Sequence, residues 1–168
     1  IVFGAVGTAG QRCTTLRRLI VHESVYNELL SKLKPAYASL AVGDQFNAET
    51  LVGPLIDGAA VERMQNALSS ARAKEYIVHG GEHLGDCLVR PAIVEVTEQC
   101  ELVRTETFAP ILYMLKYSEL TEAIQLHNGV PQGLSSCIFT DNLQEAETFT
   151  SAVGSDCGIV NVNIGPSG

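Results

Sequence analysis

One cysteine stands among small residues near the start of the chain, in the stretch GTAGQRCTT. The thiol of Cys13 becomes a nucleophile when it is deprotonated, and helix N-termini or oriented backbone N–H groups favour the thiolate. Gly7 and Gly10 allow a backbone to approach closely, and Thr14-Thr15 could continue into a first helical turn. These residue types fit a catalytic nucleophile, and the alternative is a buried structural thiol.

A second stretch, TETFAP at 105–110, places a carboxylate two residues before an aromatic ring. Glu106 could accept hydrogen bonds from two adjacent hydroxyl groups, as on a ribose. Phe108 could lie against a flat ring. The alternative is a solvated glutamate at the start of a strand, with Phe108 in the core.

A third stretch, GIVNVN at 158–163, alternates apolar residues with Asn161 and Asn163, which puts both carboxamides on one face of a strand. They either line a site or form the solvent face of an edge strand. The four histidines have no obvious partners, and a turn explains the glycines of HGGEH at 79–83 without a metal ion. Because no histidines or cysteines stand at metal-ligand spacing, we expect no metal site.

The elements that must position these residues follow from the spacing of apolar side chains. Helical spacing predicts helices over 25–40, after Asp57, around 120–127 and after Asp141-Asn142. Ser24 is a possible cap of the first helix, and Pro35 predicts a kink or a new helix start because proline removes a backbone donor.

Between these helices lie short runs rich in β-branched and aromatic residues, which predict strands. The runs are 17–23, 76–79, 88–96, 111–117, 135–140 and 158–164. Strands that alternate with helices indicate an α/β fold with a mostly parallel sheet and helices on both faces. The length of 168 residues predicts a single domain over 1–168.

Composition restricts the partners and the compartment. The net charge of −8, from 19 acidic and 11 basic residues, argues against nucleic acid or an anionic membrane as a partner. No run approaches the roughly 20 apolar residues that a membrane-spanning helix needs. Five scattered cysteines suggest free thiols in a reducing compartment, so we expect a cytoplasmic protein, or one of the mitochondrial matrix in a eukaryote. The chain opens at Ile1 inside an apolar segment, and we expect a piece of something longer.

Five motifs in this order resemble the aldehyde dehydrogenase superfamily: GQRC at 10–13, GPLID at 53–57, TETFAPIL at 105–112, NGVPQGLSSCIFT at 128–140 and GIVNVN at 158–163. The resemblance runs through almost the whole chain. It is greatest for the antiquitin branch, whose substrate is α-aminoadipic semialdehyde or its cyclic form piperideine-6-carboxylate, and whose cofactor is NAD. It implies the cysteine-bearing catalytic domain of an enzyme that forms a dimer or tetramer. The dinucleotide-binding domain and the C-terminal oligomerisation segment of the family are not matched here.

The resemblance also implies roles for single residues. Cys13 would add to the aldehyde carbon and form a thiohemiacetal, hydride would pass to NAD, and water would hydrolyse the remaining thioester. The backbone N–H of Cys13 would help to hold the oxyanion. NADP is not excluded, because contacts to the adenosine ribose belong to the unmatched domain. The implied cofactor contacts are Glu106 and Phe108, and the implied supporting residues are Gly10, Gln11, Gly133 and Asn163.

The chain departs from the family pattern at several places. Gln132 stands where the family usually has an aromatic residue, and Gly165-Pro166 replace the usual Pro-Thr of the branch. The general-base glutamate of the family lies further upstream than the twelve residues that precede Cys13. We therefore expect the chain alone to turn over aldehyde poorly. Two alternatives remain open, a non-catalytic α/β domain with a vestigial cysteine and a thiol hydrolase that works without a cofactor.

Overall fold

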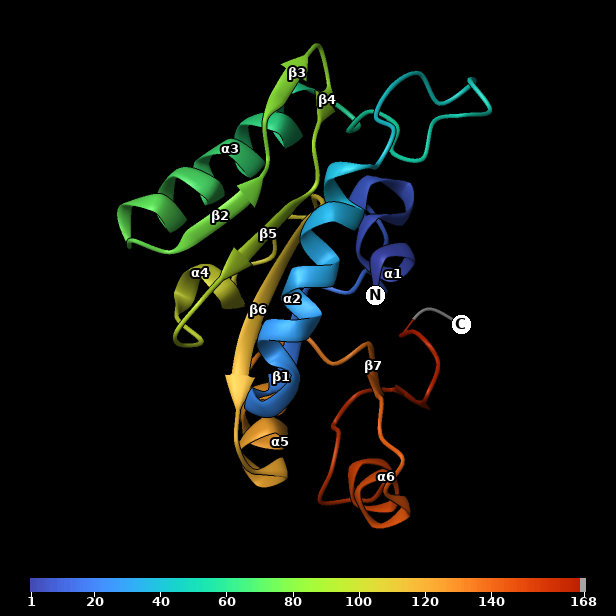
Figure 1. Ribbon diagram of the computed structural model, residues 1–168, viewed down its shortest axis with the longest axis vertical. Helices are drawn as coiled ribbons and strands as arrows, with labels where there is room; N and C mark the ends of the chain where they lie inside the picture. The colour runs from blue at the N-terminus through green and yellow to red at the C-terminus, as the bar shows by residue number, and fades with distance from the viewer. Residues whose placement is uncertain (167–168) are drawn as a thin grey trace.

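The computed structural model of the protein describes residues 1–166 and is built around a four-stranded central sheet (Figure 1). In spatial order its strands are β1 (Arg18–His22), β6 (Ile111–Tyr117), β5 (Ala92–Glu95) and β2 (Ile77–Gly80). Strands β1 and β5 both run parallel to β6, and β2 pairs with β5 in the antiparallel sense. The predicted α/β fold with a mostly parallel sheet is confirmed.

The antiparallel strand follows from a short connection. Strand β2 passes into a hairpin of β3 (His83–Gly85) and β4 (Leu88–Val89), which leads directly into β5. So short a link cannot carry the chain back to start a parallel strand. The single strand predicted over 88–96 is therefore wrong in detail, since it is broken at Arg90-Pro91 into β4 and β5.

All four predicted helices are present, and three short helical turns accompany them. The long ones are α2 (Glu23–Ala38), α3 (Gly58–Ala73), α5 (Leu120–Asn128) and α6 (Leu143–Thr150). The sequence did not predict α1 (Val2–Val6), the 3-10 helix Gly7–Gly10 and α4 (Glu101–Arg104). Segments of four or five residues are too short to display a helical period, which explains the omission.

Helix α2 differs from its prediction at both ends. Its N-cap is His22, whose ring nitrogen Nδ1 accepts from the backbone N–H of Ser24 at 3.2 Å. The expected new start at Pro35 is wrong, because the helix continues through this residue. Buried side chains on both sides of the proline, Leu33 and Tyr37, hold that turn against the core. Packing of an apolar face therefore outweighs the lost backbone hydrogen bond.

The core lies on both sides of β6. Its five consecutive residues Ile111–Leu115 are all buried, and since neighbouring side chains point to opposite faces, both faces of the strand are covered. Helix α2 crosses one side of the sheet, and α3 lies along β2 (Figure 1). Within residues 1–166, none of the helices has the length and apolar character that crossing a membrane demands.

A separate two-stranded sheet stands at the end of the molecule opposite the β3–β4 hairpin (Figure 1). Strands β7 (Ser135–Ile138) and β8 (Ile159–Val162) pair in parallel, with α6 between them in the chain. This βαβ unit positions the last of the candidate residues, whereas the central sheet positions the others.

Candidate active site

Cys13 is exposed in a tight turn that follows the 3-10 helix. The turn is closed by the backbone N–H of Thr15, which donates to the Arg12 carbonyl oxygen at 3.1 Å, and by the Arg12 N–H, which donates to Oγ1 of Thr15. Within residues 1–166 the backbone N–H of Cys13 donates to no other residue. The alternative of a buried structural thiol is wrong, and one residue presents both a thiol and a free amide donor.

The backbone before Cys13 has an unusual conformation that brings two motifs together. Thr8 and Ala9 have φ of +54° and +53°, and Gly10 has φ of +68°. Gly10 lies against the backbone of Ala109 and Pro110. The stretches GQRC and TETFAP, far apart in the sequence, therefore adjoin in the fold.

Gln11 joins the Cys13 turn to a third motif. Its Oε1 accepts from the backbone N–H of Ile56 at 2.9 Å, and its Nε2 donates to the Pro54 carbonyl at 3.4 Å and to the Thr8 carbonyl at 3.2 Å. Both oxygen and nitrogen of the carboxamide are used. Gln11 therefore links the Cys13 turn to residues 54–56, and its supporting role in a site stays a prediction.

Glu106 presents a half-exposed carboxylate beside the half-buried cation of Arg17. Its side chain is 49% exposed, and Oε1 lies 3.8 Å from Nη1 of Arg17. The Arg17 guanidinium is held from the other side, where Nη2 donates to the Thr105 carbonyl at 3.5 Å. Burial lowers the pKa of Arg17, and the charge of Glu106 partly offsets this effect. The carboxylate oxygens make no hydrogen bond to any residue of 1–166 and can accept them from a ligand.

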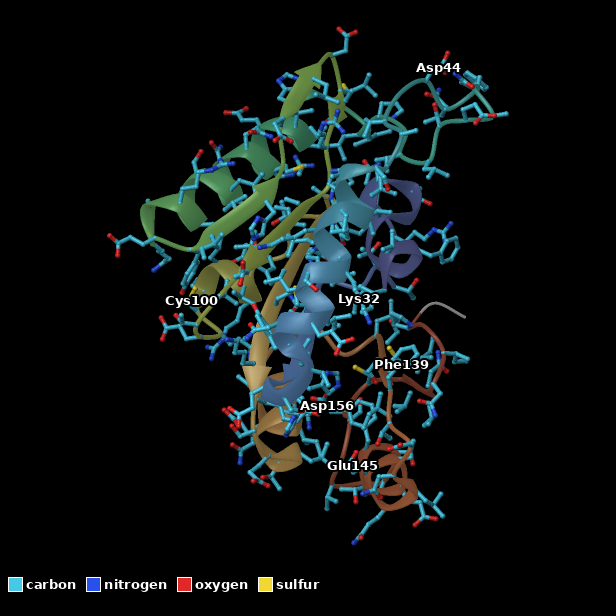
Figure 2. The ribbon with its side chains drawn as sticks, in the orientation of Figure 1. Lys32, Asp44, Cys100, Phe139, Glu145 and Asp156 are labelled. Carbon is cyan, nitrogen blue, oxygen red and sulfur yellow. The ribbon has the colours of Figure 1, made fainter. Side chains whose placement is uncertain are left out.

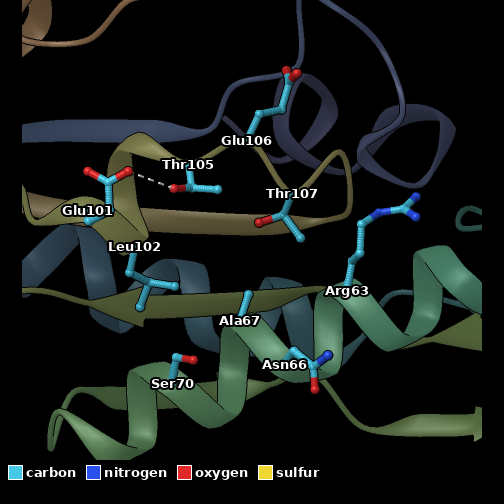
Figure 3. A pocket seen from close by; sticks show the side chains of 9 residues that line it. All are labelled: Arg63, Asn66, Ala67, Ser70, Glu101, Leu102, Thr105, Glu106 and Thr107. Carbon is cyan, nitrogen blue, oxygen red and sulfur yellow. Dashed lines mark hydrogen bonds between the residues drawn. The ribbon is translucent and has the colours of Figure 1, made fainter.

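A cavity of about 420 Å³ lies next to this motif, between α3 and α4. Figure 3 shows Thr107 pointing toward α3 and Arg63, whereas the Glu106 side chain points away from α3. Glu106 thus faces the side on which Arg17 and the N-terminal segment lie. Glu106 is also one of the residues that line the cavity, together with its neighbours Thr105 and Thr107.

Phe108 does not lie in the core. Phe108 is 37% exposed. The φ of Phe108 is +56°, a left-handed conformation that aromatic residues rarely adopt. The alternative that placed Phe108 in the core is wrong. An exposed aromatic ring in a strained backbone, next to the contact between Ala109 and Gly10, is available to a planar ligand.

Asn163 and Gly133 stabilise the β7–β8 pair. Asn163 lies just beyond β8 with φ of +59°, and its carboxamide accepts from the Thr140 N–H at 3.0 Å and donates to the Thr140 carbonyl at 2.9 Å. The Gly133 carbonyl accepts from the Gly158 N–H at 2.9 Å. The predicted strand over 158–164 is therefore too long, and Asn163 does not share a strand face with Asn161. No hydrogen bond among residues 1–166 joins these residues to Cys13.

The contacts of the four histidines decide whether one of them can act as a base for Cys13. Each histidine has a partner other than Cys13: His22 contacts Ser24, His79 contacts Glu95, His83 contacts the Asp86 carbonyl and His127 contacts Ser155. None of them is placed to deprotonate the Cys13 thiol. Arg17 is not among the predicted site residues, because its partner Glu106 lies far away in the sequence and gives no local signal.

Comparisons with known proteins identify the family of the chain. A family model described as the aldehyde dehydrogenase family matches residues 1–168. The chain is 48% identical to aldehyde dehydrogenase family 7 member A1 of Pisum sativum, covering 100% of the chain and 34% of that protein. It is 42% identical to α-aminoadipic semialdehyde dehydrogenase of Mus musculus, covering 100% of the chain and 32% of that protein. The chain therefore spans about a third of the length of these relatives.

Two solved dehydrogenase structures contain a part with the same fold as this chain. Aldehyde dehydrogenase 21 from Physcomitrella patens, in complex with succinate, superposes with a TM-score of 0.91 at 29% identity over 99% of the chain and 34% of that protein. A glyceraldehyde-3-phosphate dehydrogenase from Methanocaldococcus jannaschii, in complex with NADP, superposes with a TM-score of 0.93 at 28% identity over 99% and 36%.

Proposed function

The chain belongs to the aldehyde dehydrogenase family, and from this we propose that it is the cysteine-bearing part of an enzyme that oxidises an aldehyde to a carboxylic acid. The observation that carries the proposal is the exposed Cys13 in a turn that Gly10 and Gln11 hold against two other motifs. A nucleophile needs to be accessible and fixed in place, and Cys13 meets both conditions.

The thiolate of Cys13 adds to the carbonyl carbon of the aldehyde, which forms a C–S bond and moves the carbonyl electron pair onto the oxygen. The free backbone N–H of Cys13 donates to that oxygen, so that charge develops next to a fixed donor. A nicotinamide cofactor, when bound, would supply the acceptor for the hydride that leaves this carbon as its C=O bond re-forms, and Glu106 and Phe108 would hold it. Water then cleaves the thioester on Cys13, releasing the acid and the thiol.

Glu106 and Phe108 fit the contacts that a nicotinamide nucleotide requires. The two unbonded carboxylate oxygens of Glu106 suit two adjacent ribose hydroxyls, and the exposed Phe108 ring suits a flat heterocycle. The NADP complex of the Methanocaldococcus jannaschii relative supports a nicotinamide cofactor. We propose NAD, with NADP as the alternative, because these two residues would contact the half that both cofactors share.

The proposed substrate is α-aminoadipic semialdehyde or a similar small semialdehyde. The 42% identity to the Mus musculus enzyme that carries this name supports it. Gly165-Pro166 stand where the branch usually has Pro-Thr, so other semialdehydes are the first alternative substrates to test.

We further propose that residues 1–168 form one domain of a longer protein, which supplies the general base and the dinucleotide-binding domain. The chain spans about a third of the length of these relatives, which supports this proposal. We place that protein in the cytoplasm, or in the mitochondrial matrix of a eukaryote, as a dimer or tetramer. If α-aminoadipic semialdehyde is the substrate, the protein takes part in the degradation of lysine.

The deciding experiment measures the absorbance of reduced nicotinamide formed by the complete protein that contains this segment. It is given α-aminoadipic semialdehyde and several simple aldehydes, with NAD or NADP. The Cys13→Ala variant should lose activity, and Cys100→Ala, which changes a thiol beside Tyr76 at the start of α4, should keep it. A folded protein without activity toward any aldehyde would favour the vestigial-cysteine alternative. Ester cleavage that needs Cys13 but no cofactor would favour the thiol hydrolase.

A further inference from the structure

A second cluster of reactive side chains lies away from Cys13, where α5 ends and the loop before β8 begins. It consists of the imidazole of His127, the carboxylate of Asp156 and the thiol of Cys157. One ligand atom from each lies within 4.8 Å of the others. Figure 2 labels Asp156 at this end of the molecule, beside α5. No metal site is predicted here from the sequence, because these residues do not stand at metal-ligand spacing along the chain.

We propose that His127, Asp156 and Cys157 bind a zinc ion. Nitrogen, oxygen and sulfur ligands of these three kinds are the usual protein ligands of Zn²⁺. The Nε2 of His127 lies 3.6 Å from Sγ of Cys157. In a tetrahedral site with Zn–N of ~2.1 Å and Zn–S of ~2.3 Å, these two atoms are about 3.6 Å apart. The existing geometry therefore matches one edge of a zinc tetrahedron.

The surrounding hydrogen bonds fix the cluster before any ion binds. Asn128 donates from Nδ2 to the Gly154 carbonyl at 2.8 Å, and its Oδ1 accepts from the Asp156 N–H at 3.2 Å. Ser155 Oγ lies 2.8 Å from Nε2 of His127 and accepts from the Cys157 N–H at 3.3 Å. The helix end and the loop are thus held together. A bound ion would take over the His127 nitrogen from Ser155.

The charges of the cluster also suit a divalent cation. A carboxylate and a thiolate together neutralise Zn²⁺. The cation Arg18 lies nearby, but its guanidinium donates to Gln99 Oε1 and to the Leu126 and His127 carbonyls, at 2.7, 2.7 and 2.9 Å.

The consequence of such a site would be mechanical. His127 lies in the last turn of α5, which packs on β1 and β6, whereas Cys157 lies two residues before the start of β8. A metal bridge between them would tie the β7–β8 unit to the central sheet. With three protein ligands, the fourth position would hold water or a ligand.

The test titrates the purified protein, freed of metal, with Co²⁺ as a spectroscopic substitute for Zn²⁺. The visible bands of tetrahedral, thiolate-bound cobalt should appear at one equivalent and disappear on addition of Zn²⁺. Cys157→Ser should weaken Co²⁺ binding by at least about 10-fold, and Asp156→Asn should weaken it as well. Cys13→Ser, the matched control at the exposed thiol, should leave the bands unchanged. This control separates the zinc site from the proposed catalytic cysteine.

The absence of the bands, or bands that survive Cys157→Ser and vanish in Cys13→Ser, would overturn the proposal. A second measurement on the unaltered protein covers the case in which a variant fails to fold. Stoichiometric Zn²⁺ should slow alkylation of Cys157 by iodoacetamide, measured by peptide mass spectrometry, and should leave alkylation of Cys87 unchanged. Equal rates at Cys157 with and without Zn²⁺ would contradict the site.

Discussion

Gly10 lies so close to Ala109 that a Cβ atom at position 10 would stand 2.6 Å from the Ala109 carbonyl carbon and 2.7 Å from its oxygen. The obstacle is backbone, which cannot rotate away as a flexible side chain can. The φ of +68° at Gly10 also disfavours every residue with a side chain. This contact places the Cys13 turn against the segment before β6 that carries Glu106.

The first prediction concerns this contact. Gly10→Ala should lower the free energy of unfolding by at least about 2 kcal/mol, because it combines a steric clash with a strained backbone. Urea unfolding monitored by circular dichroism measures the change. Gly7→Ala is the matched control, since Gly7 has φ of −52° and a Cβ there would meet nothing within 4 Å. Similar losses in the two variants would show that the contact is unimportant.

The second prediction concerns the relative reactivity of the thiols. Cys13 is exposed and should be alkylated first, whereas burial raises the pKa of Cys137. A raised pKa means that less thiolate exists at a given pH, so Cys137 should react slowly and should gain reactivity only at higher pH than an ordinary thiol. Rates of alkylation between pH 7 and about 10, followed by peptide mass spectrometry, test this order. Equal rates at all five cysteines would instead favour the vestigial-cysteine alternative.

The third prediction concerns Glu106 as a cofactor contact. Glu106→Gln should raise the KM of the complete protein for the nicotinamide cofactor by about 10-fold, as expected for the loss of a charge-assisted hydrogen bond. Stability should change by less than about 0.5 kcal/mol, because the ion pair with Arg17 is long and half exposed. Glu62→Gln, an exposed change on α3, serves as the control for lost charge. An unchanged KM in Glu106→Gln would exclude the role.

The fourth prediction separates two contributions of Asn163. Asn163→Gly removes both hydrogen bonds to Thr140 but tolerates the φ of +59°, whereas Asn163→Ala also introduces backbone strain. Asn163→Gly should lower the free energy of unfolding by about 1–2 kcal/mol, because two hydrogen bonds are lost. Asn163→Ala should lower it by about 1 kcal/mol more than Asn163→Gly does, because of the added backbone strain. Thermal unfolding measures the difference. If alanine proves no worse than glycine, the left-handed backbone at Asn163 contributes no strain.

Much of the secondary structure could be predicted because its signals are local. The caps Asp57 and Asn142 accept hydrogen bonds from the backbone of α3 and α6, as their positions before apolar helical patterns indicated. Local signals misled where packing competed with them. Pro35 predicted a kink or a new helix start, and the new start is wrong because the buried face of α2 keeps the helix continuous.

The sequence by itself determined the α/β class, the four longer helices, most strands and the motifs around Cys13 and Glu106, since each depends on residues close together in the chain. Only the tertiary structure decided which motifs meet. Arg17 reaches the backbone of Thr105 across 88 residues, and His127 meets Cys157 across 30. Periodicity reports which face of an element is apolar, but it carries no information about which distant partner covers that face. The pairing of Gly10 with Ala109 therefore follows from the packing of the sheet as a whole.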